Sequence, residues 1–227
     1  MKDPTGFDGF GGNYSNSGFK NNTKERILLE SASLFTRDGY FGVSVKDIAN
    51  AVGIKPASLY NHYESKEALW KAVLDRIQDL YMKFFDSLKK MGSESNSIAE
   101  IISNLFLELK ESSRMFTFYG ISLIQSEQFH SSLAADMYYN LLIKYSIDNI
   151  KAQFDDIIAS SDKVNFDTQT VATMIMHSFL NMVNARVQEH MGINTLQINV
   201  LEQIDSIRDF ILSTVQNNIL NNGGLKA

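Results

Sequence analysis

The chain has 227 residues, 44% of them hydrophobic and 21% charged, and a formal charge of −5 at pH 7. This is the composition of an ordinary globular protein that is long enough to bury a sizeable core. The chain has no cysteine, which excludes disulfides and thiolate zinc sites. No apolar run approaches the roughly 18 residues of a membrane span. We therefore expect a cytoplasmic protein.

Residues 1–22 are rich in glycine, asparagine and serine and show no helical period, which predicts a flexible N-terminal arm. Arms that lie in a DNA groove usually carry several Arg or Lys residues. In this arm Lys2 and Lys20 are offset by Asp3 and Asp8. We therefore favour a tail over a DNA-binding arm, although the sequence leaves a contact with DNA open.

A first helix is expected from about Lys24, capped by Thr23, to Asp38, with Gly39 closing it. Its apolar residues cluster on one face and should form a small core with apolar residues of the two helices that follow. This expected core consists of Ile27, Leu28, Ala32, Leu34, Phe35, Ile48, Val52 and Leu59.

Two short helical patterns follow between Ser44 and Lys66. Ser44 and Asp47 have the spacing of a capping box, and Gly53 suits the left-handed position that closes a helix. Pro56 suits the first turn of a second helix, expected over about Ala57 to Tyr63. A short helix, a glycine turn and a second helix with polar side chains predict a helix-turn-helix, whose second helix is of a size to enter a major groove.

Charge is divided unevenly along the chain. Residues 20–71 carry eight Lys or Arg against six Asp or Glu, whereas residues 72–227 carry twelve against eighteen. This division favours a head that faces nucleic acid, attached to an acidic body.

The remaining sequence is apolar at helical spacing and shows no alternation typical of strands. The expected helices cover 65–91, 97–109, 115–125, 133–158, 168–191 and 199–220. We therefore predict an all-α protein of about nine helices, with a three-helix helix-turn-helix head on a larger helical body. The predicted domains are the arm 1–22, the DNA-binding head 23–70, the ligand-binding and dimerisation body 71–222, and a disordered tail 223–227.

Residues 24–71 resemble the DNA-binding domain of the TetR family of bacterial transcriptional regulators. Lys55-Pro56-Ala57 and Asn61 depart from or vary within the family pattern at base-contacting positions, so the resemblance does not give the operator sequence. The matching residues are Arg26, Ile27, Leu28, Ala32, Leu34, Phe35, Gly39, Tyr40, Val45, Asp47, Ile48, Ala49, Val52, Gly53, Ile54, Ser58, Leu59, Tyr60, His62, Tyr63, Ser65, Lys66, Glu67 and Leu69.

The resemblance implies a transcriptional regulator, most simply a repressor, that binds a palindromic double-stranded operator as a homodimer. It also implies release by a small-molecule effector, which the composition of the candidate pocket residues suggests is largely apolar. No cofactor or enzymatic activity is expected, because the sequence shows no catalytic motif. The expected DNA-binding residues are Ser44, Val45, Lys46, Lys55, Pro56, Ala57, Ser58, Tyr60, Asn61, His62 and Lys66.

Side-chain chemistry suggests how these residues divide the work. Lys46 and Lys55 can each reach a guanine edge or a phosphate, and Asn61 can pair with adenine or contact a phosphate or thymine. Tyr60 and His62 resemble the family's phosphate ligands, which fix register without reading sequence. Lys66, in the first turn of the next helix, would help to hold a phosphate.

Two further sets of residues are expected in the body. The ligand set combines aromatic residues and methionines with polar groups: Phe116, Phe118, Tyr119, Met137, Tyr138, Met174, His177 and Asn181. The dimer set lies on the last two helices, which in the family form a four-helix interface: Val171, Ile175, Phe179, Met182, Ile204, Ile207, Ile211 and Val215.

Three alternatives are weaker. His130, His177 and His190, with Glu127 three residues before His130, raise a metal sensor, but no histidine pair has metal-site spacing. The same fold could serve an accessory or architectural DNA-binding protein controlled by a protein partner. An enzyme hidden in the body would need a polar cluster, and no nucleophile–base set or phosphate loop stands out.

Overall fold

The computed structural model describes residues 23–95, 97–111, 115–159, 167–193 and 199–223, and every regular element in these ranges is helical. This confirms the all-α fold class. The described residues form two compact units: unit 1 contains residues 23–81 and 119–138, and unit 2 contains the rest. The functional domain boundaries predicted above stay a prediction, and the predicted arm and all but the first residue of the predicted tail lie outside the described residues. None of the described helices is both long and apolar enough to cross a membrane.

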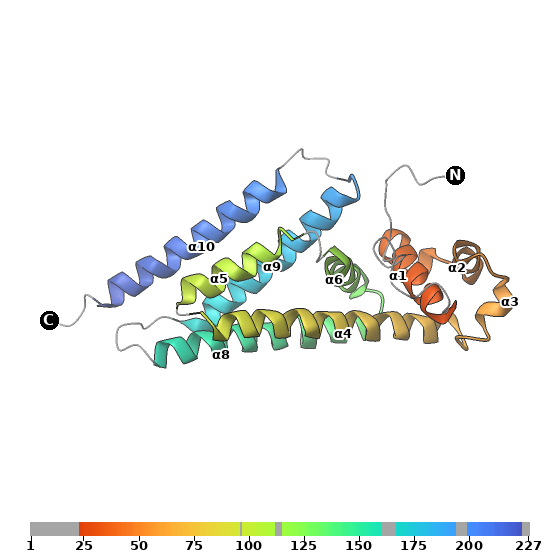
Figure 1. Ribbon diagram of the computed structural model, residues 1–227, viewed down its shortest axis with the longest axis horizontal. Coiled ribbons are helices and arrows are strands. Elements are labelled where there is room, and N and C mark those ends of the chain that lie inside the picture. The colour runs from red at the N-terminus through yellow and green to blue at the C-terminus, as the bar shows by residue number, and fades with distance from the viewer. Residues whose placement is uncertain (1–22, 96, 112–114, 160–166, 194–198, 224–227) are drawn as a thin grey trace. The chain divides into compact units, whose positions relative to one another are not determined.

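Unit 1 gathers the amino-terminal helices around the start of a long helix (Figure 1). The core residues predicted from the sequence are buried here, except that Leu34 is only half-buried. Val43, Tyr63, Leu69 and Trp70, which the prediction did not include, are also buried in unit 1. The elements are α1 (Thr23–Gly42), α2 (Val45–Val52), α3 (Pro56–Leu59), the first part of α4 (Lys66–Ser93), the end of α6 (Met115–Glu127) and α7 (Ser132–Asp136).

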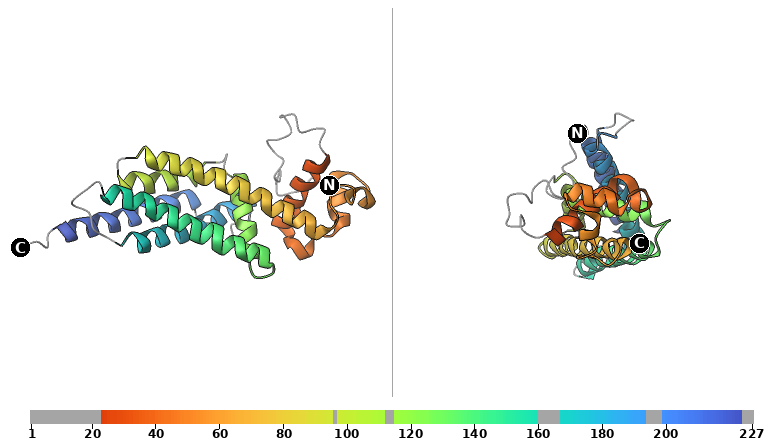
Figure 2. Two further views of the ribbon diagram at one scale, coloured as in Figure 1. Left: turned by 90° about the horizontal axis from the view of Figure 1, so that it is seen from below. Right: turned by 90° about the vertical axis from the view of Figure 1, so that its right-hand side faces the viewer.

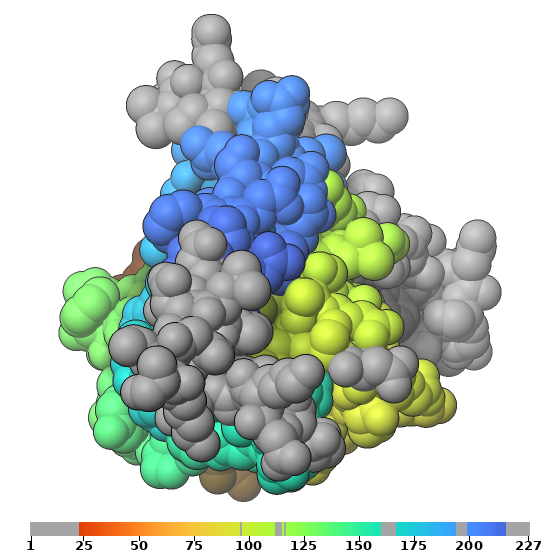
Figure 3. All heavy atoms as spheres, turned by 90° about the vertical axis from the view of Figure 1, so that its left-hand side faces the viewer, coloured from red at the N-terminus to blue at the C-terminus, as the bar shows by residue number. Residues whose placement is uncertain are grey.

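Unit 2 contains the rest of α4, which is unbroken along its length (Figure 2, left), and four further helices. They are α5 (Ile98–Glu108), α8 (Ser146–Ala159), α9 (Thr168–His190) and α10 (Val200–Gly223). The core is aromatic: the rings of Phe84 and Phe179 stack with centroids 5.9 Å apart, and Phe118 meets both edge-on. Helix α10 lies against α5 and α9 and presents its other face to solvent (Figure 3).

A π-helical segment, η4 (Met137–Tyr145), joins α7 to α8. The sequence predicted one α-helix over residues 133–158, and the chain is indeed helical from Ser132 to Ala159, but its middle turns are wider. The Ser146 hydroxyl donates to the carbonyl of Leu141 at 3.1 Å, five residues earlier. Periodicity alone does not reveal such a segment, because its backbone hydrogen bonds span only one residue more than those of an α-helix.

Candidate DNA-binding site

Helix α2 begins and ends as its sequence predicts. The Asp47 amide donates to the Ser44 hydroxyl at 3.2 Å, and the Ser44 amide donates to the Asp47 carboxylate at 2.9 Å, so the capping box is complete. Hydrogen bonds from the Ser44 side chain and backbone lower the pKa of Asp47. Gly53 closes the helix in the left-handed conformation, with φ 77° and ψ 34°.

Helix α3 is shorter than predicted. It covers Pro56–Leu59, and the chain then continues in turns in which the amides of His62 and Tyr63 both donate to the Leu59 carbonyl. The prediction of a helix over about Ala57 to Tyr63 was therefore too long. Tyr63 is buried, and its hydroxyl donates to the carbonyl of Lys24 on α1 at 3.3 Å. No local pattern reveals this contact, because its partners are 39 residues apart in the sequence.

None of the eleven residues predicted to bind DNA is buried. The half-buried members are Val45, Ser58, His62 and Lys66. Among the exposed members, Tyr60 has 52% of its surface accessible to solvent. The fully exposed members are Ser44, Lys46, Lys55, Pro56, Ala57, Tyr60 and Asn61. The start of α2 and the first residues of α3 thus present polar, basic and small side chains to solvent, whereas Leu59 at the end of α3 is buried. Their individual contacts with DNA stay predictions.

Lys66 differs from the other predicted phosphate ligands because its ammonium group is engaged within unit 1. Its Nζ donates to the carbonyl of Tyr40 at 2.5 Å and lies 4.2 Å from the centroid of the Tyr40 ring. Burial lowers the pKa of Lys66, and the charge of Glu127 partly opposes that effect. In this structure the Lys66 ammonium group therefore already has a partner other than a phosphate.

We call helices α2 and α3 the reading unit. One residue that supports it was not among those predicted from the sequence. Arg26 on α1 donates from Nη2 to the carbonyl of Val52 at 2.7 Å and so satisfies the last turn of α2. Although Arg26 belongs to the resemblance, nothing in the sequence shows which carbonyl it reaches.

The predicted dimer and ligand residues on α9 lie on the opposite faces from those expected. Seven members of the dimer set are buried inside the chain, and Ile207 is half-buried. Met174, His177 and Asn181 from the ligand set instead line an open groove of about 430 Å³ along the outward face of α9. The reason is helical phase: Val171, Ile175 and Phe179 share the inward stripe, so Met174 and His177 must face outward.

The other predicted ligand residues differ in burial. Phe118 and Tyr119 are buried, whereas Met137 and Tyr138 are half-buried at the start of η4. Burial raises the pKa of Tyr119 to about 12. The side chain of Phe116 lies outside the described residues.

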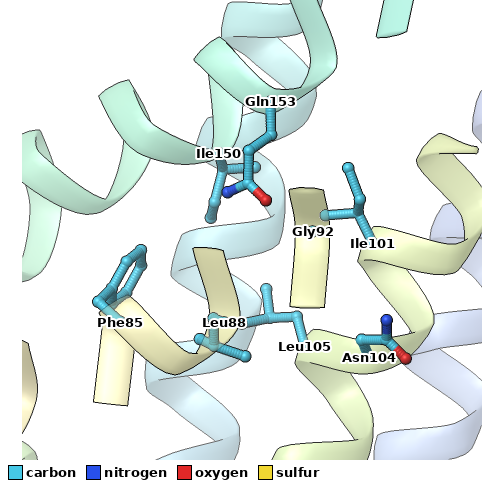
Figure 4. Close-up of a pocket in the computed structure, with 8 residues that line it drawn as sticks. All are labelled: Phe85, Leu88, Gly92, Ile101, Asn104, Leu105, Ile150 and Gln153. Atoms are coloured by element: carbon cyan, nitrogen blue, oxygen red, sulfur yellow. The ribbon is translucent and has the colours of Figure 1, made fainter. Parts of the chain in front are cut away.

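A small cavity of about 20 Å³ lies elsewhere in unit 2, between α4, α5 and α8 (Figure 4). No predicted ligand residue lines it. Its walls are Phe85, Leu88, Gly92, Ile101, Asn104, Leu105, Ile150 and Gln153.

The polar residues in this wall are Asn104 and Gln153, and the Gln153 amide is the buried one. Its Oε1 is buried and finds no hydrogen-bond partner among the described residues. A Cβ on Gly92 would lie 1.6 Å from this oxygen, so the glycine makes room for the amide. A cavity of this size holds about one water molecule, far less than the roughly 300–1,000 Å³ of a typical ligand site.

The residues considered for a metal site lie as follows. Glu127 is 5% exposed and accepts a hydrogen bond from the Tyr40 amide, whereas His130, His177 and His190 are exposed. Over the ranges that the structure describes, no three His, Cys, Asp or Glu residues gather in a group that could hold a metal ion.

Comparisons with known proteins point to the same part of the chain. Residues 27–73 match the model of a family described as bacterial regulatory proteins, tetR family. Among curated proteins, the chain is similar to the biofilm operon icaADBC HTH-type negative transcriptional regulator IcaR of Staphylococcus epidermidis, with 32% identity over 83 residues. That match spans 37% of this chain and 43% of the relative, so it covers less than half of the relative's length.

Solved structures resemble nearly the whole chain. A TetR transcription regulator from Haloarcula marismortui matches 86% of this chain and 97% of its own, with a TM-score of 0.60 and 19% identity. The transcriptional regulator FadR from Bacillus subtilis, solved in complex with stearoyl-CoA, matches 83% of this chain and 97% of its own, with a TM-score of 0.57 and 15% identity. At these identities the likeness concerns the fold.

Proposed function

We propose that this chain, which belongs to the TetR family of bacterial regulatory proteins, is a DNA-binding transcriptional regulator that acts as a homodimeric repressor. The observation that carries the proposal is the exposed surface of α2 and α3, where none of the predicted DNA-binding residues is buried. The description of the staphylococcal relative as a negative regulator supports repression.

On this proposal α3 enters the major groove, and the exposed side chains around it divide between bases and phosphates. Lys55, just before α3, and Lys46, in the first turn of α2, supply positive charge on the exposed surface. Tyr60 and Asn61 follow α3 directly, so they lie beside the groove rather than along a longer helix. The shortness of α3 restricts direct base reading to a few positions in each half-site.

The charge pattern of unit 2 supports a second copy as the partner. Helix α9 has no Asp, Glu, Lys or Arg from Thr168 to Ala185, and α10 has none from Phe210 to Gly223. Protein interfaces are depleted of charge at their centre and enriched in aromatic residues. Phe210, 65% exposed at the start of the uncharged half of α10, is the strongest candidate for an anchor.

Dimerisation also follows from the size of the reading unit. A four-residue helix and its flanks make few contacts, and two copies on an inverted repeat gain affinity from being linked. Symmetric dimers of helix-turn-helix proteins bind half-sites about 34–36 Å apart. We therefore propose an operator with two such half-sites.

We propose that an apolar effector acts by widening the cavity between α4, α5 and α8. The cavity wall combines aliphatic and aromatic side chains with the amides of Asn104 and Gln153, which suits an acyl chain with a polar end. The stearoyl-CoA complex of the FadR structure supports this ligand class. Opening the cavity must separate helices, and this would couple effector binding to conformation by a typical 1–3 kcal/mol.

The second candidate is a DNA-binding protein of the same fold that a protein partner controls. The small size of this cavity, about 20 Å³, favours it. Stearoyl-CoA distinguishes the two candidates: at least a tenfold loss of operator affinity supports the effector. Unchanged affinity and unchanged melting temperature with this acyl-CoA support control by a partner.

Selection of bound duplexes from a random-sequence library tests the main proposal. The expected result is enrichment of an inverted repeat whose half-sites are about one helical turn apart. Asn61→Ala should alter the preference at one position in each half-site and leave the spacing unchanged. Enrichment of no sequence at physiological salt would contradict a sequence-specific regulator.

A further inference from the structure

The peptide of Tyr40 is held from both sides by charged residues of other helices. Its N–H donates to Oε1 of Glu127, the last residue of α6, at 3.1 Å. Its carbonyl accepts from Nζ of Lys66, in the first turn of α4, at 2.5 Å. We name these three residues the Tyr40 clamp; all of them belong to unit 1.

Glu127 is an unusual residue for its position. It is 5% exposed, and α6 carries no other charged residue from Met115 to Ser126. Its second oxygen, Oε2, is buried without a hydrogen-bond partner among the described residues. Burying a carboxylate in this way is costly, so the hydrogen bond to Tyr40 and the nearby positive charge of Lys66 are what retain it there.

Gly39 gives the backbone the turn that the clamp needs. Its φ of 74° and ψ of 160° interrupt the helical path of α1, in a region that essentially only glycine adopts. A Cβ at this position would lie 3.1 Å from Oε1 of Glu127. The turn and the lack of a side chain together bring the Tyr40 amide to the carboxylate.

A second link joins the same segments. Trp70 on α4 packs against Phe35 and Tyr40, with ring centroids 5.4 and 5.1 Å away. Its indole N–H donates to the hydroxyl of Ser131 at 3.2 Å, and this hydroxyl also caps α7. The residues from Glu127 to Ser131 are therefore tied twice to the helices around the reading unit.

We propose that the Tyr40 clamp positions α2 and α3 for DNA binding, with Glu127 and Lys66 as positioning residues. Lys66 then acts inside the protein and does not hold a phosphate. Only Val43 and Ser44 separate the end of α1 from α2, so a shift of the Tyr40 peptide passes directly to the reading unit. Displacing the end of α6 would leave the Tyr40 amide without its acceptor, which makes the reading unit sensitive to α6. The DNA-binding part of this inference rests on the proposed function.

Hydrogen exchange of the Tyr40 amide, measured by NMR, tests the clamp without DNA. Glu127→Ala removes the acceptor, so exchange should become about tenfold faster or more. Glu127→Gln keeps a carbonyl oxygen at the same place and should largely restore protection. Asp136→Ala, at an exposed carboxylate on α7, is the matched control and should leave exchange unchanged.

Operator binding over a range of salt concentrations then tests the role of Lys66. If Lys66 acts through the clamp, Lys66→Ala weakens binding but leaves the salt dependence unchanged. A phosphate ligand would instead lower the slope of log K against log salt by about one per subunit. Because Lys66 and Glu127 hold one peptide, the double alanine variant should bind little worse than Glu127→Ala alone.

Two outcomes would overturn the inference. One is Tyr40 exchange that Glu127→Ala does not change, and the other is a reduced salt slope in Lys66→Ala with normal Tyr40 exchange. If the unaltered protein binds no duplex, the proposed function fails, whereas the exchange experiment still decides whether the clamp exists.

Discussion

Replacing Gly39 by alanine should destabilise unit 1 far more than the same change at Gly42, three residues later. At Gly39 the backbone has φ 74° and ψ 160°, which costs a residue with a Cβ about 1–3 kcal/mol. The new Cβ would also lie 3.1 Å from Oε1 of Glu127, so the buried carboxylate must shift. We expect a total of about 2–3 kcal/mol, a large part of a typical domain stability of about 5–15 kcal/mol.

Gly42→Ala is the matched control. A Cβ there would meet only the Cβ of Asp38, at an ordinary contact distance of 3.7 Å. Because alanine loses less backbone entropy than glycine, this variant should be neutral or more stable by up to about 1 kcal/mol.

The assay is urea unfolding followed by the fluorescence of Trp70, the only tryptophan in the chain, which is 2% exposed in unit 1. Gly39→Ala should lower the midpoint at an unchanged slope, and Gly42→Ala should not. Equal midpoints for the two variants would refute both the backbone reasoning and the closeness of Glu127 to the turn.

The remaining predictions concern the dimer and the capping box. Phe210→Asp should turn the dimer into a monomer in analytical ultracentrifugation. Leu201→Asp, at an exposed residue in the charged half of α10, should leave the dimer intact. Monomers in both variants, or in neither, would argue against Phe210 as the anchor. The pKa of Asp47 is lowered by Ser44, so its contribution to stability should be complete above its ordinary value of 3.8 and disappear as the pH falls through the lower folded value. Urea midpoints of the unaltered protein and Asp47→Ala should therefore differ at neutral pH and converge in acid, and a constant difference would exclude this linkage.

Local chemistry made α2 predictable from the sequence. Ser44, Asp47 and Gly53 act on their own neighbourhood, and all three lie in the structure as their residue types require. The length of α3 could not be obtained in this way. The helix ends at Leu59, and the buried Tyr63 bonds to the carbonyl of Lys24, far away in sequence. Tertiary contacts of this kind override a local helical pattern.

The partner of Lys66 and the buried face of α9 could not be predicted for the same reason. A lysine in the first turn of a helix commonly faces solvent, and only the fold brings the Tyr40 carbonyl to it. On α9 apolar residues are so frequent that the sequence leaves the direction of the core open. The lack of charged residues from Thr168 to Ala185 is visible in the sequence. Because it extends around the helix, it does not show which face is buried.

The most direct test of the account removes the two exposed lysines of the reading surface. Lys46→Ala with Lys55→Ala should weaken binding to the selected duplex by about 100-fold or more, because charge-assisted contacts contribute roughly 1.5–3 kcal/mol each. Lys89→Ala with Lys90→Ala removes the same charge from exposed positions near the end of α4, outside the proposed site, and should change the affinity by less than about threefold. Equal affinities for the two double variants would contradict the claim that α2 and α3 are the surface that binds DNA.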